Sequence, residues 1–389
     1  MMENVIIIGG GHVGSTLAVD MFLRRNETNL DPHLVLMHYG NHLFQQNSGK
    51  KSFRCENIMT GEVNETIFPS QNVHAINHDI RYLMQSAVAV IVTVPDIPLL
   101  RKMLIEYLEA CPINPGATIT FVRAGQGGQL CLMDKWRKSS RLNKLHLLMV
   151  EDSFYGTRCI DNIIEFKRKN VTRVATLSEK PDEAMNCVIQ LFSGPSVPDN
   201  QHQFEQVRPL DLQFDPLGYI IHLAVALDKT NLTKTASGTQ YLHYSDGVHE
   251  ENAGLIDALD HERVALARSY GAETRLFTTM LTEQYGLPQQ PTFLEMAKST
   301  KSIYRSLSEK SLNSLKTGRM IQEDYPGLLT MGWFAEISGE NFMVTRDYVN
   351  QITQMLQALK VNTDGLDYYH NYLNALNLNK SDLVGMLSN

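Results

Sequence analysis

The feature that most constrains the fold is a glycine cluster that directly follows a short apolar run near the start of the sequence. The run covers residues 5–8, and Gly9, Gly11 and Gly14 then give the spacing G-x-G-x-x-G. Apolar residues recur with helical spacing after Gly14, so the stretch predicts a strand, a tight turn and a helix. The backbone of such a turn can approach a pyrophosphate, which the unpaired N–H groups and the positive end of the helix attract. We predict a dinucleotide site formed by Gly9, Gly11, His12, Val13 and Gly14.

Further apolar runs indicate that this first strand belongs to a larger sheet. They cover residues 33–39, 87–94, 117–122, 145–150 and 171–177. Strands that are apolar along their whole length are typical of a parallel sheet with both faces covered by helices. We therefore predict an α/β fold in which residues 1–200 form a Rossmann-type doubly wound parallel sheet.

Two loops that follow predicted strands are candidates for lining the cofactor. Thr93, Val94 and Pro95 come at the end of one strand, and "RAGQGG" at residues 123–128 follows the next. Ligands of open α/β sheets bind at the carboxyl ends of the strands, so we expect Thr93, Val94 and Pro95 to contact the dinucleotide. The alternative is that these loops are simple turns.

The segment after the second predicted strand bears on the choice of cofactor. An NAD-specific site usually has an acidic residue there to bind the ribose hydroxyls, but residues 37–54 contain no acid. Lys50 and Lys51 could approach a 2′-phosphate, or they could belong to a solvated basic loop. We expect NADP(H) to be favoured over NAD(H).

The second half of the sequence has a different pattern. Residues 195–216 mix prolines with polar residues, which is typical of a connection between domains. Helical spacing dominates from residue 217, most clearly at residues 253–272 and 346–359. We predict that residues 201–389 form an all-α domain that follows the Rossmann-type domain.

Composition excludes several other classes of protein. The net charge of −7, from 35 basic and 42 acidic residues, gives no basic surface for nucleic acid. No apolar run approaches the length of a membrane span, and no secretory signal is visible. The five cysteines are dispersed without a CxxC pair, which argues against a zinc site and for reduced thiols in the cytoplasm. We expect a cytoplasmic protein that binds small molecules and no metal, membrane or nucleic acid. A homodimer is possible.

Several segments together, in order and spacing, resemble the opine dehydrogenases, the family of octopine and nopaline dehydrogenases. They are the glycine motif, "AGQGG" in the loop after residue 123, "EDSFYGTR" at residues 151–158, and "GYIIHLAVAL" at residues 218–227. Residues 243–271 and "RMIQEDYPGLL" at residues 319–329 continue the resemblance. It implies a Rossmann domain followed by a helical catalytic domain.

The resemblance also implies a reaction and its residues. Opine dehydrogenases condense the amino group of an amino acid with an α-keto acid and reduce the imine with NAD(P)H. Their catalytic histidine would fall on His222 and its acidic partner on Asp324, while Gln126 and Arg158 would bind substrate. An imidazole can exchange a proton near neutral pH, and a carboxylate can fix its tautomer. The alternatives are that His222 is a core histidine, that Asp324 is a helix cap, and that Arg158 belongs to an interdomain salt bridge.

Three departures from the family pattern leave the substrates open. Leu223 follows His222 where a proline is common, and Met320 stands where a tyrosine is common. Gly156 replaces the acid of the metallophore-forming branch, so membership of that branch is open. Two other functions also remain: a ketopantoate-reductase-like or 2-hydroxyacid dehydrogenase, and a non-catalytic NADP-binding sensor.

Overall fold

The structure is a computed structural model that describes residues 2–37, 51–76, 80–123, 126–299 and 307–388. The chain folds as two units. The first unit comprises Met1–Val94, Met103–Ala124 and Met133–Val207, and the second comprises Pro95–Lys102, Gly125–Leu132 and Arg208–Asn389. The division passes within helices α4 (Pro98–Ala110) and α5 (Gln126–Lys138). The domain boundary that the sequence suggests at residue 200 stays a prediction.

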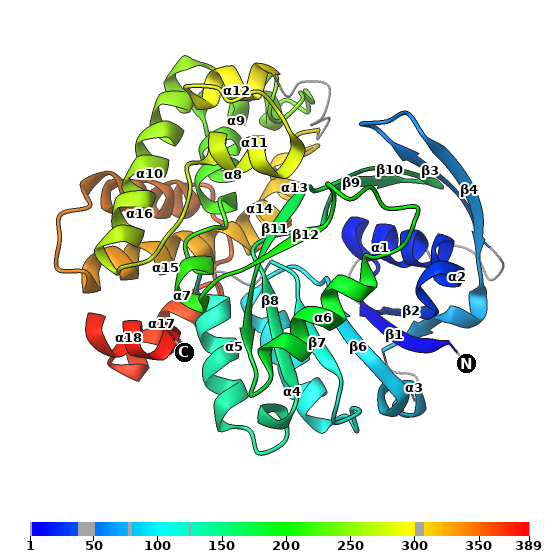
Figure 1. Ribbon diagram of the computed structural model, residues 1–389. Helices are drawn as coiled ribbons and strands as arrows, with labels where there is room; N and C mark the ends of the chain where they lie inside the picture. Colours follow the sequence, from blue (N-terminus) through cyan, green and yellow to red (C-terminus); the bar gives the residue numbers. More distant parts are fainter. Residues whose placement is uncertain (1, 38–50, 77–79, 124–125, 300–306, 389) are drawn as a thin grey trace. The chain divides into compact units, whose positions relative to one another are not determined.

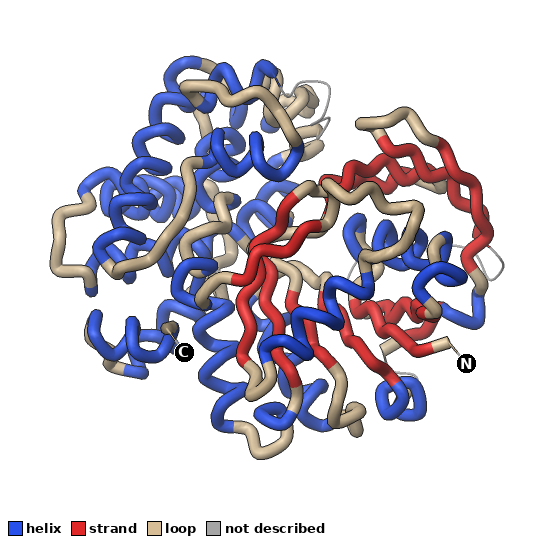
Figure 2. The backbone as a smooth tube through the Cα atoms, in the orientation of Figure 1, coloured by secondary structure: helices blue, strands red, loops and turns tan. Residues whose placement is uncertain are grey.

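The main sheet of the first unit has eight strands in the order β12-β11-β8-β7-β6-β1-β2-β5 (Figures 1 and 2). Their bounds are β1 Glu3–Ile8, β2 Leu30–Leu36, β5 Val73–Ala75, β6 Ala87–Val92, β7 Thr118–Phe121, β8 His146–Val150, β11 Val171–Leu177 and β12 Gln203–Gln206. The strands from β5 to β8 are all parallel, whereas β11 pairs antiparallel with β8.

The order of the six parallel strands confirms the predicted fold class. In space the parallel strands follow the order β5-β2-β1-β6-β7-β8. When they are numbered by their order along the chain, this is 3-2-1-4-5-6, the order of a Rossmann-type sheet. Residues 5–8 of β1 are fully buried, as expected for a central strand that is covered on both faces. The order reverses between β1 and β6, so the ends of these two strands form the place where such sheets bind ligands.

A second sheet in the same unit is not apparent from the sequence. Its order is β4-β3-β10-β9, with β3 Lys51–Asn57, β4 Val63–Phe68, β9 Tyr155–Ile160 and β10 Ile163–Arg168. Its edge strand β9 packs against helix α1 (His12–Leu23), where the hydroxyl groups of Thr16 and Thr157 lie 2.6 Å apart. Its strands carry charged residues between apolar ones, so they lack the continuous apolar runs that reveal the main sheet.

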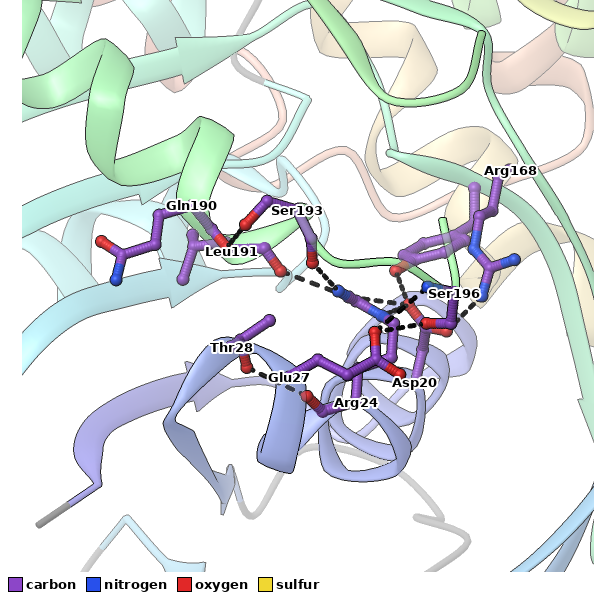
Figure 3. Close-up of polar contacts among 10 residues, drawn as sticks. Asp20, Arg24, Glu27, Thr28, Arg168, Gln190, Leu191, Ser193 and Ser196 are labelled. Atoms are coloured by element: carbon purple, nitrogen blue, oxygen red, sulfur yellow. Dashed lines mark hydrogen bonds and ion pairs between the residues drawn. The ribbon is translucent and has the colours of Figure 1, made fainter. Parts of the chain in front are cut away.

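A buried ionic cluster fixes α1 to the rest of the first unit (Figure 3). Asp20 on α1 accepts hydrogen bonds from Arg24 at 3.1 Å, from Arg168 on β10 at 2.7 Å and from the Tyr155 hydroxyl at 2.6 Å. Arg24 also donates to the carbonyl groups of Leu191 and Ser193 at the end of α6 (Pro181–Leu191). The cluster thus joins α1, β9, β10 and α6.

The remaining short elements of the first unit connect these strands. They are α2 Arg25–Thr28, α3 Arg81–Ser86 and the 3-10 turns η1 Ser70–Asn72 and η2 Leu142–Lys144.

The second unit is helical, as the sequence predicts. Its helices are α7 Pro209–Leu212, α8 Gly218–Ala226, α9 Lys229–Ala236, α10 Glu250–Ser269, α11 Phe277–Tyr285, α12 Phe293–Ser299, α13 Leu312–Thr317, α14 Arg319–Gln322, α15 Asp324–Ile337, α16 Met343–Ala358, α17 Tyr368–Leu376 and α18 Lys380–Leu387. Helix α8 packs against α10, α14 and α15. Gly271, with a φ of 72°, follows the end of α10, where its N–H bonds the carbonyl of Arg268.

The segment at residues 195–216, predicted as a connection, contains two regular elements. Strand β12 pairs with β11 at the edge of the main sheet, and α7 forms one helical turn. Within the described residues, no helix is long and apolar enough to cross a membrane.

Candidate active site

The glycine turn after β1 has the geometry that its spacing predicts. Gly9 has a φ of 119°, which side chains rarely allow. A Cβ on Gly14 would overlap the carbonyl oxygen of Gly9, so only glycine lets α1 start this close to β1. The Thr93 hydroxyl, just after β6, donates to the carbonyl groups of Ile8 and Gly9, both at 3.1 Å. Gly9, Gly14 and Thr93, three of the predicted cofactor residues, therefore lie where the strand order reverses.

The amino end of α1 is suited to an anion. Gly11 is the N-cap residue, and no side chain of the described residues caps the first N–H groups. A Cβ on Gly11 would meet no atom within 4 Å, so the space in front of this turn is open. Unpaired N–H groups at the positive end of a helix dipole are the donors that bind phosphate oxygens. The residues present therefore fit the pyrophosphate of a dinucleotide.

His12 and Arg158 lie together beside this turn. The backbone N–H of Cys159 donates to Nδ1 of His12 at 3.0 Å, so Nδ1 carries no proton. The guanidinium of Arg158 lies 3.4 Å from Nε2. The pKa of His12 is lowered to about 4, mainly because the ring is desolvated and to a lesser extent because of the charge of Arg158. The residue is nevertheless exposed on its outer side. Arg158, expected to bind substrate, thus lies in the first unit next to the glycine turn.

In the second unit, His222 and Asp324 meet as the resemblance implies. His222 lies on α8, and its Nδ1 is 2.7 Å from Oδ2 of Asp324, the first residue of α15. The Asp324 side chain is 1% exposed and that of His222 is 21% exposed. The carboxylate is therefore shielded from water, while part of the ring stays accessible. The pairing places the Nδ1 proton on the Asp324 side and leaves Nε2 for exchange with another group.

Nε2 of His222 has a partner that sequence reasoning missed. The hydroxyl of Tyr244 lies 2.9 Å from Nε2. The buried ring of His243 lies against both groups, with centroids 5.7 Å from His222 and 5.1 Å from Tyr244. Asp324, His222 and Tyr244 thus form a hydrogen-bonded series from a buried carboxylate to a half-buried phenol. The "SDG" turn signal after Tyr244 marks a tight turn there, but no pattern in the sequence links that turn to His222.

Asp324 is bordered by other buried groups of the second unit. Burial and the charge of Asp324 raise the pKa of Tyr348 on α16 well above its ordinary value, and the Tyr348 hydroxyl has no hydrogen-bond partner among the described residues. The neighbouring Glu323 accepts a bond from the backbone N–H of Asp96 at 3.0 Å and pairs with Arg319. Glu323 is a second residue that sequence reasoning missed, and its contacts fix the start of α15.

Gln126 is held by backbone in the second unit. Its φ is 45°, and its side-chain amide donates to the carbonyl of Pro216 at 2.6 Å, two residues before α8. A Cβ on Gly327 would lie 2.8 Å from Oε1 of Gln126, so glycine at this position of α15 makes room for the amide. The amide group thus lies between the start of α8 and the first turn of α15.

The remaining predicted cofactor residues are Val13, Val94, Pro95, Lys50 and Lys51. Val13 packs against the core of the first unit, Val94 is buried, and the carbonyl of Pro95 accepts a bond from Arg101 at 3.2 Å. Lys50 lies outside the described residues. Lys51 begins β3, but its side chain is not described either. The described ranges contain no group of three or more His, Cys, Asp or Glu side chains that could hold a metal ion.

Comparisons with known proteins show that the helical part of the chain is similar to a known family domain. Residues 207–357 match the family model of the NAD/NADP octopine/nopaline dehydrogenase alpha-helical domain. The search of curated proteins found no match.

Solved structures show the same fold at low identity. An octopine dehydrogenase with NADH and L-arginine is 14% identical with a TM-score of 0.65, and covers 92% of this chain and 90% of its own. The complex with NADH and agmatine has a TM-score of 0.66 at the same identity and coverage. A dimeric ketopantoate reductase from Staphylococcus aureus is 11% identical with a TM-score of 0.54, covering 92% of this chain and 99% of its own. The resemblance seen in the sequence is thus confirmed over residues 207–357, which match the model of this alpha-helical domain, and the solved structures share the fold of the chain.

Proposed function

We propose that the protein is an opine dehydrogenase-like oxidoreductase that acts on a C–N bond. It would join an α-keto acid to the amino group of an amino acid or amino-acid-derived metabolite and reduce the product with NAD(P)H. The observation that carries the proposal is the 2.7 Å contact between His222 and Asp324, inside the segment that matches the octopine/nopaline dehydrogenase domain. The solved octopine dehydrogenases with NADH and L-arginine, agmatine or pyruvate support it.

The cofactor proposal rests on the glycine turn. Gly9, Gly11 and Gly14 with the first N–H groups of α1 would hold the pyrophosphate, and Thr93 would border it. Bound NAD(P)H would supply the hydride for the reduction. A preference for NADPH is part of the proposal and rests on the acid-free segment at residues 37–54 with Lys50 and Lys51.

Residues of the chain would accept and donate the protons of the reaction. Attack of the amine on the keto carbonyl moves one proton from nitrogen to oxygen, and a second proton must reach that oxygen before it leaves as water. Nε2 of His222 can accept and return them, because Asp324 keeps Nδ1 protonated and stabilises the charged ring. The balanced reaction converts keto acid, amine, NAD(P)H and a proton into secondary amine, NAD(P)⁺ and water.

Two further residues are proposed to bind the substrates. Arg158 presents a planar fork that suits a carboxylate, and Gln126 presents an amide held by Pro216. We also propose a homodimer, in keeping with the dimeric ketopantoate reductase of similar fold, and a cytoplasmic location, in keeping with the dispersed cysteines.

The experiment offers the protein NADPH or NADH with pairs of keto acids and amino acids and identifies products by mass spectrometry. The expected product has the mass of the two substrates minus water plus two hydrogens. Cofactor oxidation that is equally fast without any amine would overturn the proposal. It would favour the second candidate, a ketopantoate-reductase-like or 2-hydroxyacid dehydrogenase, which the fold match to ketopantoate reductase supports. Tight NADP binding without turnover would instead indicate a sensor.

A further inference from the structure

The contact between Tyr244 and His222 restricts how a substrate can reach the imidazole. Nε2 of a neutral imidazole has one lone pair, and Nε2 of a charged imidazole has one N–H, so in either state it makes one good hydrogen bond. The Tyr244 hydroxyl, 2.9 Å away, occupies that position. A substrate that exchanges a proton with Nε2 must therefore take the place of this hydroxyl.

Tyr244 lies in a turn that is closed by hydrogen bonds. The N–H groups of Asp246 and Gly247 donate to the carbonyl of Leu242 at 2.9 and 3.0 Å, closing a turn that contains Tyr244. The side chain of Asp246 accepts from the N–H of Leu242 at 3.2 Å, which closes the turn from the other side.

The same turn is fastened to the helix that carries His222. The carbonyl of Gly247 accepts bonds from the side-chain amides of Asn231 at 2.7 Å and Asn252 at 2.8 Å. Asn231 also donates to the carbonyl of Val225 on α8 at 2.9 Å. A Cβ on Gly247 would press against the Val225 side chain, so glycine permits this close approach. The distance between the Tyr244 backbone and His222 is therefore fixed, and rotation of the Tyr244 side chain is what can open Nε2.

We propose that Tyr244 is a positioning residue that holds Nε2 of His222 in the resting protein, and that the reacting oxygen or nitrogen of the substrate binds by displacing its hydroxyl. This inference rests on the proposed function. Asp324 bonds Nδ1, the ring of His243 packs on the imidazole, and the charge of Asp324 acts on Tyr348 of α16. Tyr244 is half-buried, whereas His243 is buried.

The test replaces Tyr244 with phenylalanine and measures kcat and KM for the keto acid at saturating amine and cofactor. Removing a competing hydrogen bond should lower KM about two- to tenfold, the equivalent of one ordinary hydrogen bond, with kcat retained. Tyr270→Phe is the matched control, because it removes a buried hydroxyl that bonds the carbonyl of Phe334 at 2.7 Å without contacting His222. Its KM should stay at the wild-type value. Tyr244→Leu provides a second variant without the hydroxyl.

The outcomes separate this inference from the proposed function. An unchanged or higher KM in Tyr244→Phe overturns the displacement. A large loss of kcat at unchanged KM also overturns the displacement, because the Tyr244 hydroxyl would then stay in place and transfer the proton between His222 and the substrate. If the wild type forms no product with any pair, the proposed function fails, and ¹⁵N NMR of His222 decides the remaining part. A shifted Nε2 resonance in Tyr244→Phe supports the resting-state bond, and an unshifted one overturns it.

Discussion

Asp20 and Asp324 are two buried helical carboxylates with different hydrogen-bond partners. Their side chains are 5% and 1% exposed, and each belongs to a hydrogen-bonded group that includes a tyrosine hydroxyl. Asp20 accepts bonds from two arginines and a tyrosine, whereas Asp324 bonds an imidazole whose other nitrogen faces a half-buried tyrosine.

The difference lies in the partner's ability to exchange a proton. Guanidinium groups stay charged throughout the accessible pH range, so the Asp20 cluster can only hold segments together. Burial opposes the charge of Asp20, but Arg24 and Arg168 outweigh it and hold the pKa of Asp20 well below its ordinary value. An imidazole, unlike a guanidinium, can gain and lose a proton, so the Asp324 pair can exchange one. A buried carboxylate thus indicates structure or chemistry according to the group it meets.

The largest expected effect is on stability and comes from Asp20→Asn. The substitution leaves Arg24 and Arg168 buried with their charges uncompensated, which costs about 3–5 kcal/mol. Urea unfolding followed by circular dichroism should show this loss. Turnover per folded molecule should stay near the wild-type value. A loss below about 1 kcal/mol would mean that the cluster relaxes or admits water.

Substitutions at the other carboxylate should have the opposite profile. His222→Ala and Asp324→Asn should each lower kcat by about 10²–10⁴, since the proton-exchanging ring is lost or its tautomer is no longer fixed. Unfolding free energy should change much less than in Asp20→Asn, and cofactor affinity should be unchanged. The measurement is steady-state kinetics with a fluorescence titration of NADPH. Near-wild-type turnover of His222→Ala would remove His222 from the catalytic residues.

The two carboxylates also show how far a sequence can be interpreted. The glycine turn was predictable because its determinants, Gly9, Gly11 and Gly14, are contiguous and steric. His222 and Asp324 are 102 residues apart, and only the family resemblance paired them. Tyr244 and the Asp20 cluster could not be predicted, because their contacts depend on how separate elements pack and no local spacing encodes them.

A pair of glycine variants tests the local determinant. Gly14→Ala should destabilise the first unit by about 3 kcal/mol, because the added Cβ overlaps the carbonyl of Gly9. Gly11→Ala should change stability by less than about 1 kcal/mol, since its Cβ meets no atom, yet it should weaken NADPH binding by filling the space before α1. Thermal unfolding and NADPH titration measure both. Equal stability losses would show that the overlap at Gly14 is relieved by movement of α1.

A smaller effect than that of Gly14→Ala is expected from a comparison of two histidines, His222 and His202. His222 bonds partners at both ring nitrogens, whereas His202, next to the Asp20 cluster, has no hydrogen-bond partner among the described residues at either nitrogen. Burial lowers the pKa of His202 to about 3; the charge of Asp20 opposes this shift, while Arg168 and Arg24 reinforce it.

His202 should therefore make the first unit sensitive to mild acid. The unfolded chain takes up a proton at His202 near pH 6.5, while the folded chain resists this until about pH 3, so stability falls as pH falls through that window. Between pH 6.5 and 5 the loss attributable to His202 is about 2 kcal/mol. His202→Phe should remove this slope while keeping the ring contacts with Tyr155 and Phe192. Its φ of 52° adds a strain that does not depend on pH, so the difference in slope is the quantity to measure by urea unfolding. Asp20 does not contribute between pH 6.5 and 5, because its stabilisation is lost only below about pH 4. Identical slopes in the wild type and His202→Phe would contradict the prediction and show that His202 is hydrated.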